Sequence, residues 1–430
     1  MATMRLVLLA ASVSCLLRWS VVAAATSWDP AIATLEAGAV AVEELFEYDG
    51  DSHYEFGLLM GERFRDKIRQ RIERNAKLQT LLLPYARTVE GKELYRQYLD
   101  SHSRTFPQYV AELQGMADGS GVPFEAAKLT GVLQTIFVGN IVEEFEDSIP
   151  PTFNADVVPA AQREPTLRCS DVVLTSPTLQ VVAHNEDSSA QDVNHTAIVV
   201  ARIGDAPKFV AYTYLGDLPS GAFGFNNAGI AFTLNYVQPS DTFVGGLGRG
   251  FISRDLLIAR NSSDAIDRIT RSKQATGHNF QLMDIPSARV WNIEVASFDQ
   301  HVIHEYVADS GAVSAYFHAN QYQRLEVAQP PYQSSLHRLA RYSEMRPPLT
   351  ILEALGVLGD QEDHSYPVFH DAKSHERGEL SGWTLTTIVF DLMKGVAYSF
   401  RGNPRNLDVK LVWDLKTLSV RPPAPGQVIV

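Results

Sequence analysis

The chain has 430 residues, of which 45% are hydrophobic and 20% are charged, an ordinary composition for a globular protein. This composition argues against a disordered, collagen-like or polytopic membrane protein. At roughly 150 residues per domain, the length allows two or three domains or one large one. The formal net charge is −13, and such a surface repels phosphate backbones, so no nucleic-acid partner is expected.

The N-terminal residues form a targeting pattern rather than part of the fold. A basic residue, Arg5, precedes an apolar run over 6–17, and small residues follow at 23–25. This order predicts a secretory signal peptide over 1–25, cleaved near Ala25. Arg18 interrupts the apolar run, which makes a short membrane anchor the weaker alternative.

Two sequons agree with export. Asn194 begins Asn-His-Thr and Asn261 begins Asn-Ser-Ser, and both predict N-glycosylation of a secreted protein. We therefore expect the protein to be secreted or lysosomal.

The segment after the signal peptide is predicted to be mostly helical. Residues 26–142 form this helical N-terminal region, with amphipathic patterns near 57–72, 92–116 and 123–142. Residues 143–168 are acidic and proline-rich without periodicity, and they predict an exposed linker.

The pattern changes to β-rich after residue 168. Short alternating or β-branched runs predict strands, and two pairs of helices lie between them. The predicted strands cover 171–175, 180–183, 197–203, 209–215, 222–225, 229–236, 279–284, 289–297, 301–307, 314–319, 384–392 and 395–401. The predicted helices cover 251–260, 263–272, 334–345 and 349–358. Strands and helices are segregated, which predicts an α+β fold with antiparallel sheets over 169–430.

Cysteine usage is the most informative count. The chain has two cysteines, Cys15 and Cys169, and Cys15 leaves with the signal peptide. One remaining cysteine rules out a disulfide scaffold within a mature chain. Cys169 is therefore a buried small residue, an intermolecular bridge or a reactive thiol.

The position of Cys169 favours the reactive thiol. It follows Arg168 at the junction between the linker and the first strand. Cleavage of the Arg168–Cys169 bond would make its thiol the nucleophile. Its own α-amine, with a pKa of about 8, would then be a nearby general base. No catalytic histidine is then required, and the cysteine-protease run Cys-Gly-Ser-Cys-Trp is absent around Cys169.

Three polar clusters follow Cys169 at the ends of predicted strands. They are His-Asn-Glu-Asp at 184–187, Gly-Phe-Asn-Asn-Ala-Gly at 224–229 and His-Ala-Asn-Gln at 318–321. A nucleophile that attacks an amide carbonyl needs donors for the oxyanion, and Asn side chains and backbone N–H groups supply them.

Together these segments resemble the acyl-coenzyme A:6-aminopenicillanic-acid acyltransferase family, which includes insect β-alanyl-dopamine hydrolases. The matching segments are 57–64, 109–121, 169, 184–187, 224–231, 249–254, 318–322, 386–391 and 402–404. The resemblance implies an N-terminal-nucleophile hydrolase with a four-layer αββα sandwich of two antiparallel sheets. It also implies a precursor that is cut into an α chain of about 26–168 and a β chain that begins at 169.

The resemblance also implies roles for single residues. Cys169 is the nucleophile for cleavage and turnover, Asp187 orients the new N-terminus, and Asn320 stabilises the oxyanion. The residues assigned to substrate binding are Asn185, Asn226 and Arg254.

Each of these polar residues also has an ordinary structural alternative. Asp187 could cap a turn together with Asn185. Asn226 could supply the backbone conformation of a hairpin turn. Asn320 could be a strand-end amide, and Arg254 a solvated helix residue.

The residue before the cysteine departs from the family pattern. Arg168 stands where the relative best known for self-cleavage has glycine, and arginine favours the tight turn less. Cleavage after Arg168 by an external protease is therefore an open alternative to self-cleavage.

Two other motifs predict no site. The glycine-rich run 245–250 lacks the Lys-Ser/Thr ending of a phosphate-binding loop. The histidines within 301–304 and 364–375 lack a second cysteine ligand and the His-Glu-x-x-His spacing. We therefore expect neither a cofactor nor a metal.

The expected function is hydrolysis of a linear amide, a C–N bond, or N-acyl transfer on a small-molecule amide or N-acyl substrate. An acyl-enzyme would form on Cys169, and the α and β chains would stay associated. Hydrolysis is favoured because water is always available and an exported protein meets little acyl-CoA. The alternatives are a non-catalytic secreted glycoprotein that keeps the fold as a binding module, and an N-acyl lipid amidase.

Overall fold

The computed structural model describes residues 44–121, 131–150, 153, 169–308, 311–377, 379 and 382–423. The chain divides into two compact units, 1–41 and 42–430, and all described residues belong to the second unit. Among the described residues, none of the helices combines the length and the hydropathy needed to cross a bilayer. The expected signal peptide and Arg168 lie outside the described residues.

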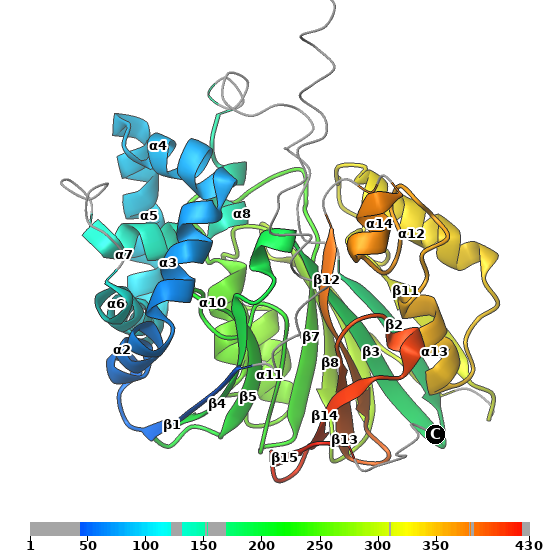
Figure 1. Cartoon of the computed structure of the whole chain (residues 1–430). Helices are drawn as coiled ribbons and strands as arrows, with labels where there is room; N and C mark the ends of the chain where they lie inside the picture. The colour runs from blue at the N-terminus through cyan, green and yellow to red at the C-terminus, as the bar shows by residue number, and fades with distance from the viewer. Residues whose placement is uncertain are drawn as a thin grey trace, which may run out of the picture. The chain divides into compact units, whose positions relative to one another are not determined.

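Two sheets lie at the centre of the second unit (Figure 1). Their strands are antiparallel to their neighbours except β1, which is parallel to β4. Sheet A has the order β1 (Glu44–Gly50), β4 (Thr196–Ile203), β5 (Phe209–Tyr214), β6 (Phe223–Asn226), β7 (Ile230–Tyr236), β8 (His278–Asp284), β9 (Arg289–Ala296) and β10 (Gln300–Glu305). Sheet B has the order β11 (Ser314–His318), β2 (Ser170–Ser176), β3 (Leu179–Ser188), β12 (Trp383–Asp391), β13 (Val396–Phe400), β14 (Val409–Asp414) and β15 (Val420–Arg421).

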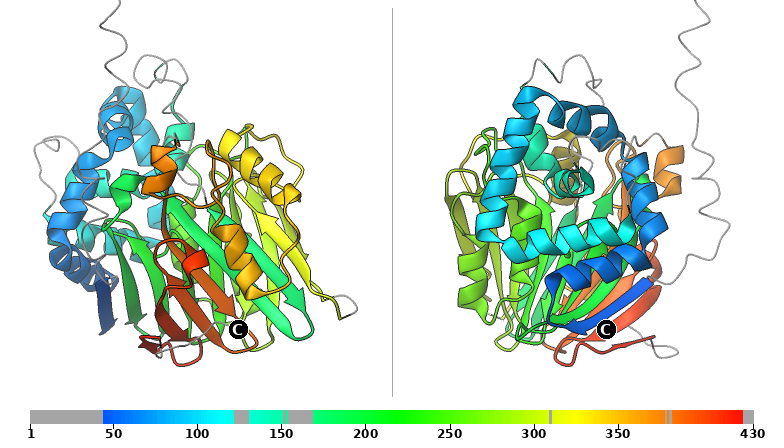
Figure 2. Two further views of the ribbon diagram at one scale, coloured as in Figure 1. Left: turned by 45° about the vertical axis from the view of Figure 1, so that its right-hand side comes forward. Right: turned by 90° about the vertical axis from the view of Figure 1, so that its left-hand side faces the viewer.

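Helices cover the outer faces of both sheets (Figure 2). Sheet A packs against α2 (His53–Arg63), α3 (Arg65–Arg74), α4 (Leu83–Ala86), α5 (Val89–Thr105), α6 (Pro107–Ser120), α7 (Gly131–Gly139), α8 (Val142–Asp147), α10 (Arg249–Leu256) and α11 (Ser262–Ile269). Sheet B packs against α12 (Gln333–Glu344) and α13 (Ile351–Leu358), and the short α14 (Ala372–Glu376) precedes β12. The α+β fold with two largely antiparallel sheets, which the sequence predicts, is confirmed. Its elements form four layers in the order helix, sheet, sheet, helix.

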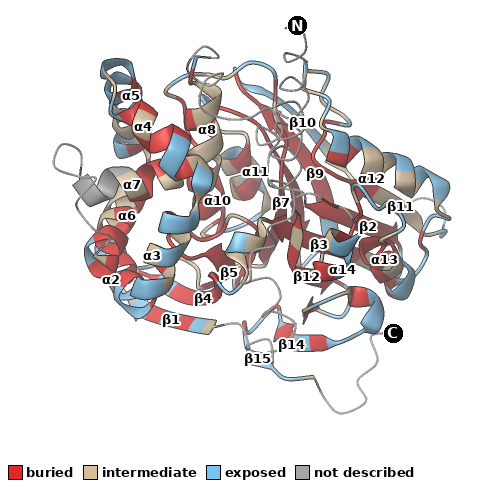
Figure 3. Cartoon of the chain, turned by 45° about the horizontal axis from the view of Figure 1, so that its top comes forward, coloured by how far each residue is buried: buried red, intermediate tan, exposed pale blue. Residues whose placement is uncertain are grey.

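Strand alternation decides which side chains enter the layer between the sheets. On β3, Val182 packs in the apolar core between the two sheets, whereas Val181 and Ala183 pack against α13. Because successive strand residues point to opposite faces, His184 and Glu186 also face the other sheet. Figure 3 shows the central strands as mostly buried, while the helices expose one side.

Three strands differ from the sequence prediction. β1 lies in the region predicted to be helical, although Phe46 and Tyr48 are buried and Leu45, Glu47 and Asp49 are exposed, as a period of two requires. β14 and β15 were not predicted at all. β1 forms its hydrogen bonds with β4, about 150 residues away in sequence. The pattern of neighbouring residues does not indicate so distant a partner.

The expected linker also begins differently from the prediction. Residues up to 147 form α8 rather than an exposed linker, and Glu144 is 1% exposed. Its Oε1 accepts a hydrogen bond from the backbone N–H of Arg249 at 2.7 Å. Asp147 Oδ1 accepts one from Gln238 Nε2 at 2.6 Å. Most of 151–168 lies outside the described residues.

Burial of these acids predicts a stability that depends on pH. Burial, followed by Glu143, raises the pKa of Glu144 to about 7, and burial, followed by Glu146, raises the pKa of Asp147 to about 8. A raised folded-state pKa contributes stability that is complete below pH ~4 and is lost as the pH rises through 7–8. We expect the two acids together to lower the free energy of unfolding by several kcal/mol, at most about 6, between pH 5 and 8.

The variant Asp147→Asn should remove part of this slope, because asparagine resembles the protonated acid. The measurement is the melting temperature from pH 5 to 8 for the natural chain, for Asp147→Asn and for Asp205→Asn at an exposed position. Equal slopes in all three chains would contradict the prediction.

Candidate active site around Cys169

Cys169 lies at the start of sheet B, one residue before β2. Ser170 pairs with Asn185 of β3, so the antiparallel register brings Cys169 beside Glu186. The side chain is 3% exposed. Its thiol lies 3.5 Å from Glu186 Oε2 and 4.0 Å from the backbone oxygen of Asp187. Burial, reinforced by the Glu186 carboxylate, raises the pKa of the thiol to about 12, so the thiol needs a base before it can attack.

His184 lies between two carboxylates beside the thiol. Its Nδ1 is 2.7 Å from Asp171 Oδ1, and its Nε2 is 3.1 Å from Glu186 Oε2. Burial opposes its charge, but Asp171 and the hydrogen bonds to Cys169 and Glu186 raise its pKa well above the usual value. The hydroxyl of Tyr214 on sheet A donates to Glu186 Oε1. The Glu186 carboxylate thus lies beside the nucleophile, and Asp171 holds the neighbouring imidazolium from its other nitrogen.

Asp171 joins this cluster to sheet A. Thr233 Oγ1 donates to its Oδ1 at 2.9 Å, and Gln281 Nε2 lies 3.3 Å from its Oδ2. All three residues are buried. The layer between the sheets is therefore polar near Cys169 and apolar where Val173 and Val182 pack.

Arg338 of α12 holds the backbone of the nucleophile from the other side. This fully buried guanidinium donates from Nη1 to the carbonyl of Cys169 at 2.7 Å and to Ser170 Oγ at 2.8 Å. Its Nη2 donates to Asn320 Oδ1 at 2.8 Å. One planar cation therefore fixes Cys169 and Asn320 relative to each other.

Asn320 is brought into the site by this contact. Its Nδ2 donates to the backbone oxygen of Tyr236 at 2.8 Å. Because an amide NH₂ group carries two protons, the second remains suited to an oxyanion. The oxyanion role of Asn320 stays a prediction.

Asp187 is a buried residue next to the nucleophile in sheet B, and its carboxylate has no close polar partner among the described residues. Within the described residues, neither carboxylate oxygen has a hydrogen-bond partner. His370 Nε2 lies 3.9 Å from Oδ2. Burial raises the pKa of Asp187 to about 6, although His370 and Thr384 partly offset it. A buried carboxylate in this state is a site for a cation.

The structure does not bring the three predicted substrate-binding residues together with Cys169. Asn185 points to the outer face of sheet B, where its Nδ2 donates to the carbonyls of Leu358 and Val368. Its Oδ1 accepts from Thr387. Its contacts are therefore those of a structural amide that joins β3 to the helical layer.

Asn226 ends β6 opposite Phe209, at the far end of β5 from Tyr214. Five residues of strand separate these positions by about 17 Å. Its Nδ2 donates to Leu257 O and Ala259 O, and its Oδ1 accepts the backbone N–H of Ala228. These contacts are those of a turn residue, but the positive φ of the hairpin falls on Gly229, at 91°, and not on Asn226.

Arg254 lies between the helices and sheet A. It is fully buried rather than solvated, donates to Glu112 at 2.9 Å, and stacks over the rings of Tyr109 and Phe209 at 4.8 Å. Sheet A separates it from the polar layer, so its contacts are those of a core ion pair.

The two predicted glycosylation residues are exposed. Asn194 follows the short turn after β3, and Asn261 caps α11 through Oδ1, which accepts the N–H of Asp264. Both Nδ2 atoms therefore belong to surface side chains, and their glycosylation stays a prediction.

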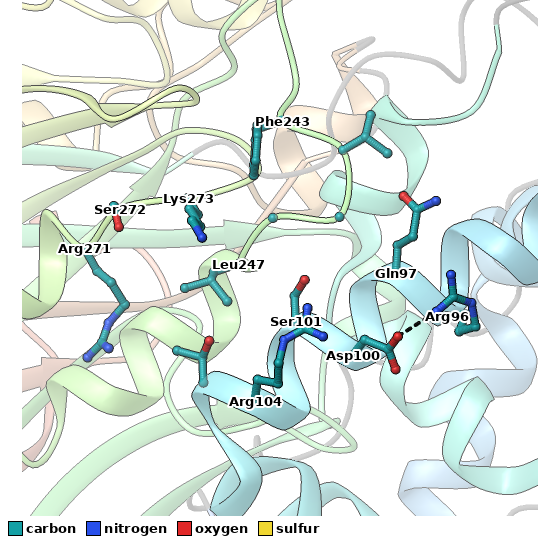
Figure 4. Close-up of a pocket in the computed structure, with 14 residues that line it drawn as sticks. Arg96, Gln97, Asp100, Ser101, Arg104, Phe243, Leu247, Arg271, Ser272 and Lys273 are labelled. Atoms are coloured by element: carbon teal, nitrogen blue, oxygen red, sulfur yellow. Dashed lines mark hydrogen bonds and ion pairs between the residues drawn. The ribbon is translucent and has the colours of Figure 1, made fainter.

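A separate cavity of about 640 Å³ lies between α5 and the loops after β7 and α11 (Figure 4). The glycine-rich run contributes Gly245 and Gly246, and four cations, Arg96, Arg104, Arg271 and Lys273, line it. None of its lining residues belongs to the cluster around Cys169, so it is not part of the candidate active site.

Sequence reasoning missed Asp171, Tyr214 and Arg338 and gave no role to His184 and Glu186. A signal existed for the last two, because strand residues two apart share a face. Arg338 stands in an ordinary amphipathic helix, and its contacts come from segments 18 and 169 residues away.

Comparisons with known proteins show the family of the chain. Residues 174–406, more than half of the chain, match the family described as acyl-coenzyme A:6-aminopenicillanic acid acyl-transferase. The chain is 26% identical over 376 residues to the β-alanyl-dopamine/carcinine hydrolase of Drosophila melanogaster, covering 83% of this chain and 92% of that protein.

Among solved structures, the C2A mutant of conjugated bile acid hydrolase from Clostridium perfringens aligns with 60% of this chain and 96% of its own. Its TM-score is 0.29 and its identity 12%, a likeness too weak to carry an argument. The family match over 174–406 is decisive: the chain belongs to the acyl-coenzyme A:6-aminopenicillanic acid acyltransferase family and is an enzyme of the amide-hydrolase and acyltransferase class.

Proposed function

We propose that the protein is an N-terminal-cysteine amidase that hydrolyses small N-acyl amines through an acyl-enzyme on Cys169. Cleavage of the Arg168–Cys169 bond creates the active form, with associated α and β chains. The observation that carries the proposal is the Asp187 carboxylate, which is buried and lacks a hydrogen-bond partner among the described residues, in a residue whose backbone oxygen lies 4.0 Å from the Cys169 thiol. The α-ammonium group that cleavage creates would supply the missing cation.

The chemistry follows from this pairing. The new α-amine takes the proton of the Cys169 thiol, and the thiolate attacks the amide carbonyl. Asn320 and backbone N–H groups stabilise the oxyanion. The α-ammonium then gives its proton to the leaving amine, and water hydrolyses the thioester.

The charges in the site favour an acyl group that carries a cation. The His184 imidazolium is the one cationic group in contact with Asp171 and Glu186 among the described residues, so this pair of carboxylates has excess negative charge. A β-alanyl group carries a primary ammonium near neutral pH. β-Alanyl amides, the compounds named for the Drosophila relative, therefore complement the site, and we propose them as the substrate class.

The compartment and the maturation step belong to the same proposal. A signal peptide over 1–25 and glycans on Asn194 and Asn261 would deliver the protein to the outside of the cell or to the lysosome. Hydrolysis rather than acyl transfer follows because water is the abundant acceptor there. Self-cleavage and cleavage by a protease after Arg168 lead to the same nucleophile.

Rapid mixing with a β-alanyl amide tests the proposal. Intact mass after acid quench should show one acyl group on the β chain, and peptide mapping should place it on Cys169. N-Acetyl amides and long-chain N-acyl amines are the comparison substrates. Turnover only of the long-chain amides would indicate a lipid amidase, and no turnover with any amide would support a binding module.

The variant Asp187→Asn should separate stability from activity. Removal of a buried unpaired charge should raise the melting temperature of the uncut chain, measured in a Cys169→Ala background, by the equivalent of about 1–3 kcal/mol. The same change should lower kcat of processed enzyme at least about 100-fold, because the α-amine loses its partner. Lower stability together with unchanged kcat would contradict the prediction.

A further inference from the structure

The side chains of Cys169, His184 and Glu186 converge on one point between the sheets. Their ligand atoms, Sγ, Nε2 and a carboxylate oxygen, all lie within 4.8 Å of one another. Glu186 Oε2 is 3.5 Å from Sγ and 3.1 Å from Nε2. We propose that these three side chains form a Zn²⁺ site that reversibly caps the nucleophile.

Two of the three separations between the ligand atoms fit tetrahedral zinc. With Zn–S near 2.3 Å and Zn–N and Zn–O near 2.0–2.2 Å, ligand atoms lie roughly 3.3–3.6 Å apart. The two measured separations are within a few tenths of an ångström of this range. One sulfur, one imidazole nitrogen and one carboxylate oxygen are the donors that zinc accepts, whereas Ca²⁺ and Mg²⁺ prefer oxygen alone.

The second shell is also built as in zinc sites. A zinc-bound histidine usually gives its other ring N–H to a carboxylate, which fixes the ring. Here His184 Nδ1 faces Asp171 Oδ1 at 2.7 Å, and Thr233 holds that carboxylate in turn. The remaining oxygen of Glu186 accepts from the Tyr214 hydroxyl. The side chains of His184 and Glu186 are therefore already held in fixed orientations by these hydrogen bonds.

The surroundings favour a dication. Cys169, His184 and Glu186 are each at most 3% exposed. Asp171 and Glu186 bring two carboxylates to the cluster. Coordination replaces the thiol proton and the Nε2 proton of His184, and both protons leave to solvent. The fourth position takes a water molecule or, after cleavage, the α-amine of Cys169, which forms a five-membered chelate with Sγ.

Linear spacing does not reveal this site, and sequence analysis predicts no metal. The cysteine and the other two ligands are 15 and 17 residues apart, and only the β2–β3 register brings them together. Metal binding depends on these side chains alone. Its consequence, reversible inhibition, rests on the proposed function, because a zinc-bound sulfur cannot attack a carbonyl.

Cobalt(II) provides the direct test, since a thiolate ligand gives an intense near-ultraviolet charge-transfer absorption that oxygen ligands lack. Purified processed protein should bind one equivalent of Co²⁺ with this absorption, and Zn²⁺ should displace it. Alkylation of Cys169 in the natural chain, which requires no variant to fold, should abolish it. His184→Gln should weaken binding at least about tenfold, whereas His301→Gln on the exposed strand β10 should not.

Stoichiometric Zn²⁺ should also inhibit hydrolysis, and a chelator should restore it. Absence of the charge-transfer absorption, or an equal absorption after alkylation, would overturn the metal site. Turnover that depends on Cys169 without metal binding would overturn the metal site and leave the proposed function intact. Metal binding without turnover of any amide would support the metal site and contradict the proposed function.

Discussion

Replacing Cys169 with alanine is expected to lower kcat/KM by at least about 10⁴-fold, because the substitution removes the only atom that forms the acyl-enzyme. The same variant should remain a single chain if cleavage is autocatalytic. Loss of activity in an uncut variant would have two explanations, so a second measurement on processed natural enzyme is needed.

Alkylation of the processed enzyme supplies that measurement. Cys169 is the only cysteine after the predicted signal peptide, so one alkyl group reports on it alone. Activity should fall in proportion to the labelled fraction, and substrate should slow the labelling. Full activity in enzyme with one alkyl group on Cys169 would show that the thiol is not the nucleophile.

Replacing Arg338 with lysine should have the second largest effect, a decrease in kcat of about 10²–10³-fold with little change in KM. The guanidinium contacts the Cys169 carbonyl and Asn320 Oδ1 through different nitrogens. Lysine keeps the charge but cannot span both acceptors. Arg338→Met should in addition destabilise the chain by about 3 kcal/mol, because three buried polar groups lose their donor.

Arg341→Lys is the matched control for this prediction. Arg341 stands on the same helix, three residues on, and pairs with Asp360 in a partly exposed position. Its substitution should change kcat less than about twofold. Equal kcat values for Arg338→Lys and Arg341→Lys would show that the Arg338 contacts do not position the nucleophile.

The fold was largely predictable because its strands have local signals. The strands predicted over 197–203 and 229–236 and the turn at 226–229 agree to within one residue with β4, β7 and the hairpin of the structure. β1 was not predicted because the segments around it have helical patterns, and the strand depends on pairing with the distant β4. α8 was not predicted because the acidic residues of this segment indicated exposure to solvent. In the structure Glu144 is buried and accepts a hydrogen bond from the backbone N–H of Arg249.

The site could be predicted from the sequence only for residues whose chemical role is indicated by their neighbours along the chain. Cys169 was identifiable from its isolation and from the linker before it. The cluster of Asp171, His184 and Glu186 depends on the register of two strands. Arg338 depends on how α12 packs over the start of β2. Asn226 and Arg254 belong to matching segments, but their contacts are hairpin and core contacts.

The most direct test of the account is the intact mass and N-terminal sequence of the purified protein, measured beside Cys169→Ala and Arg168→Ala. The account predicts two associated fragments, the second of which begins at Cys169. With self-cleavage, Cys169→Ala stays whole and Arg168→Ala is still cut; with an external protease, the reverse holds. A single uncut natural chain that hydrolyses amides, or a second fragment that begins elsewhere, would contradict the N-terminal nucleophile.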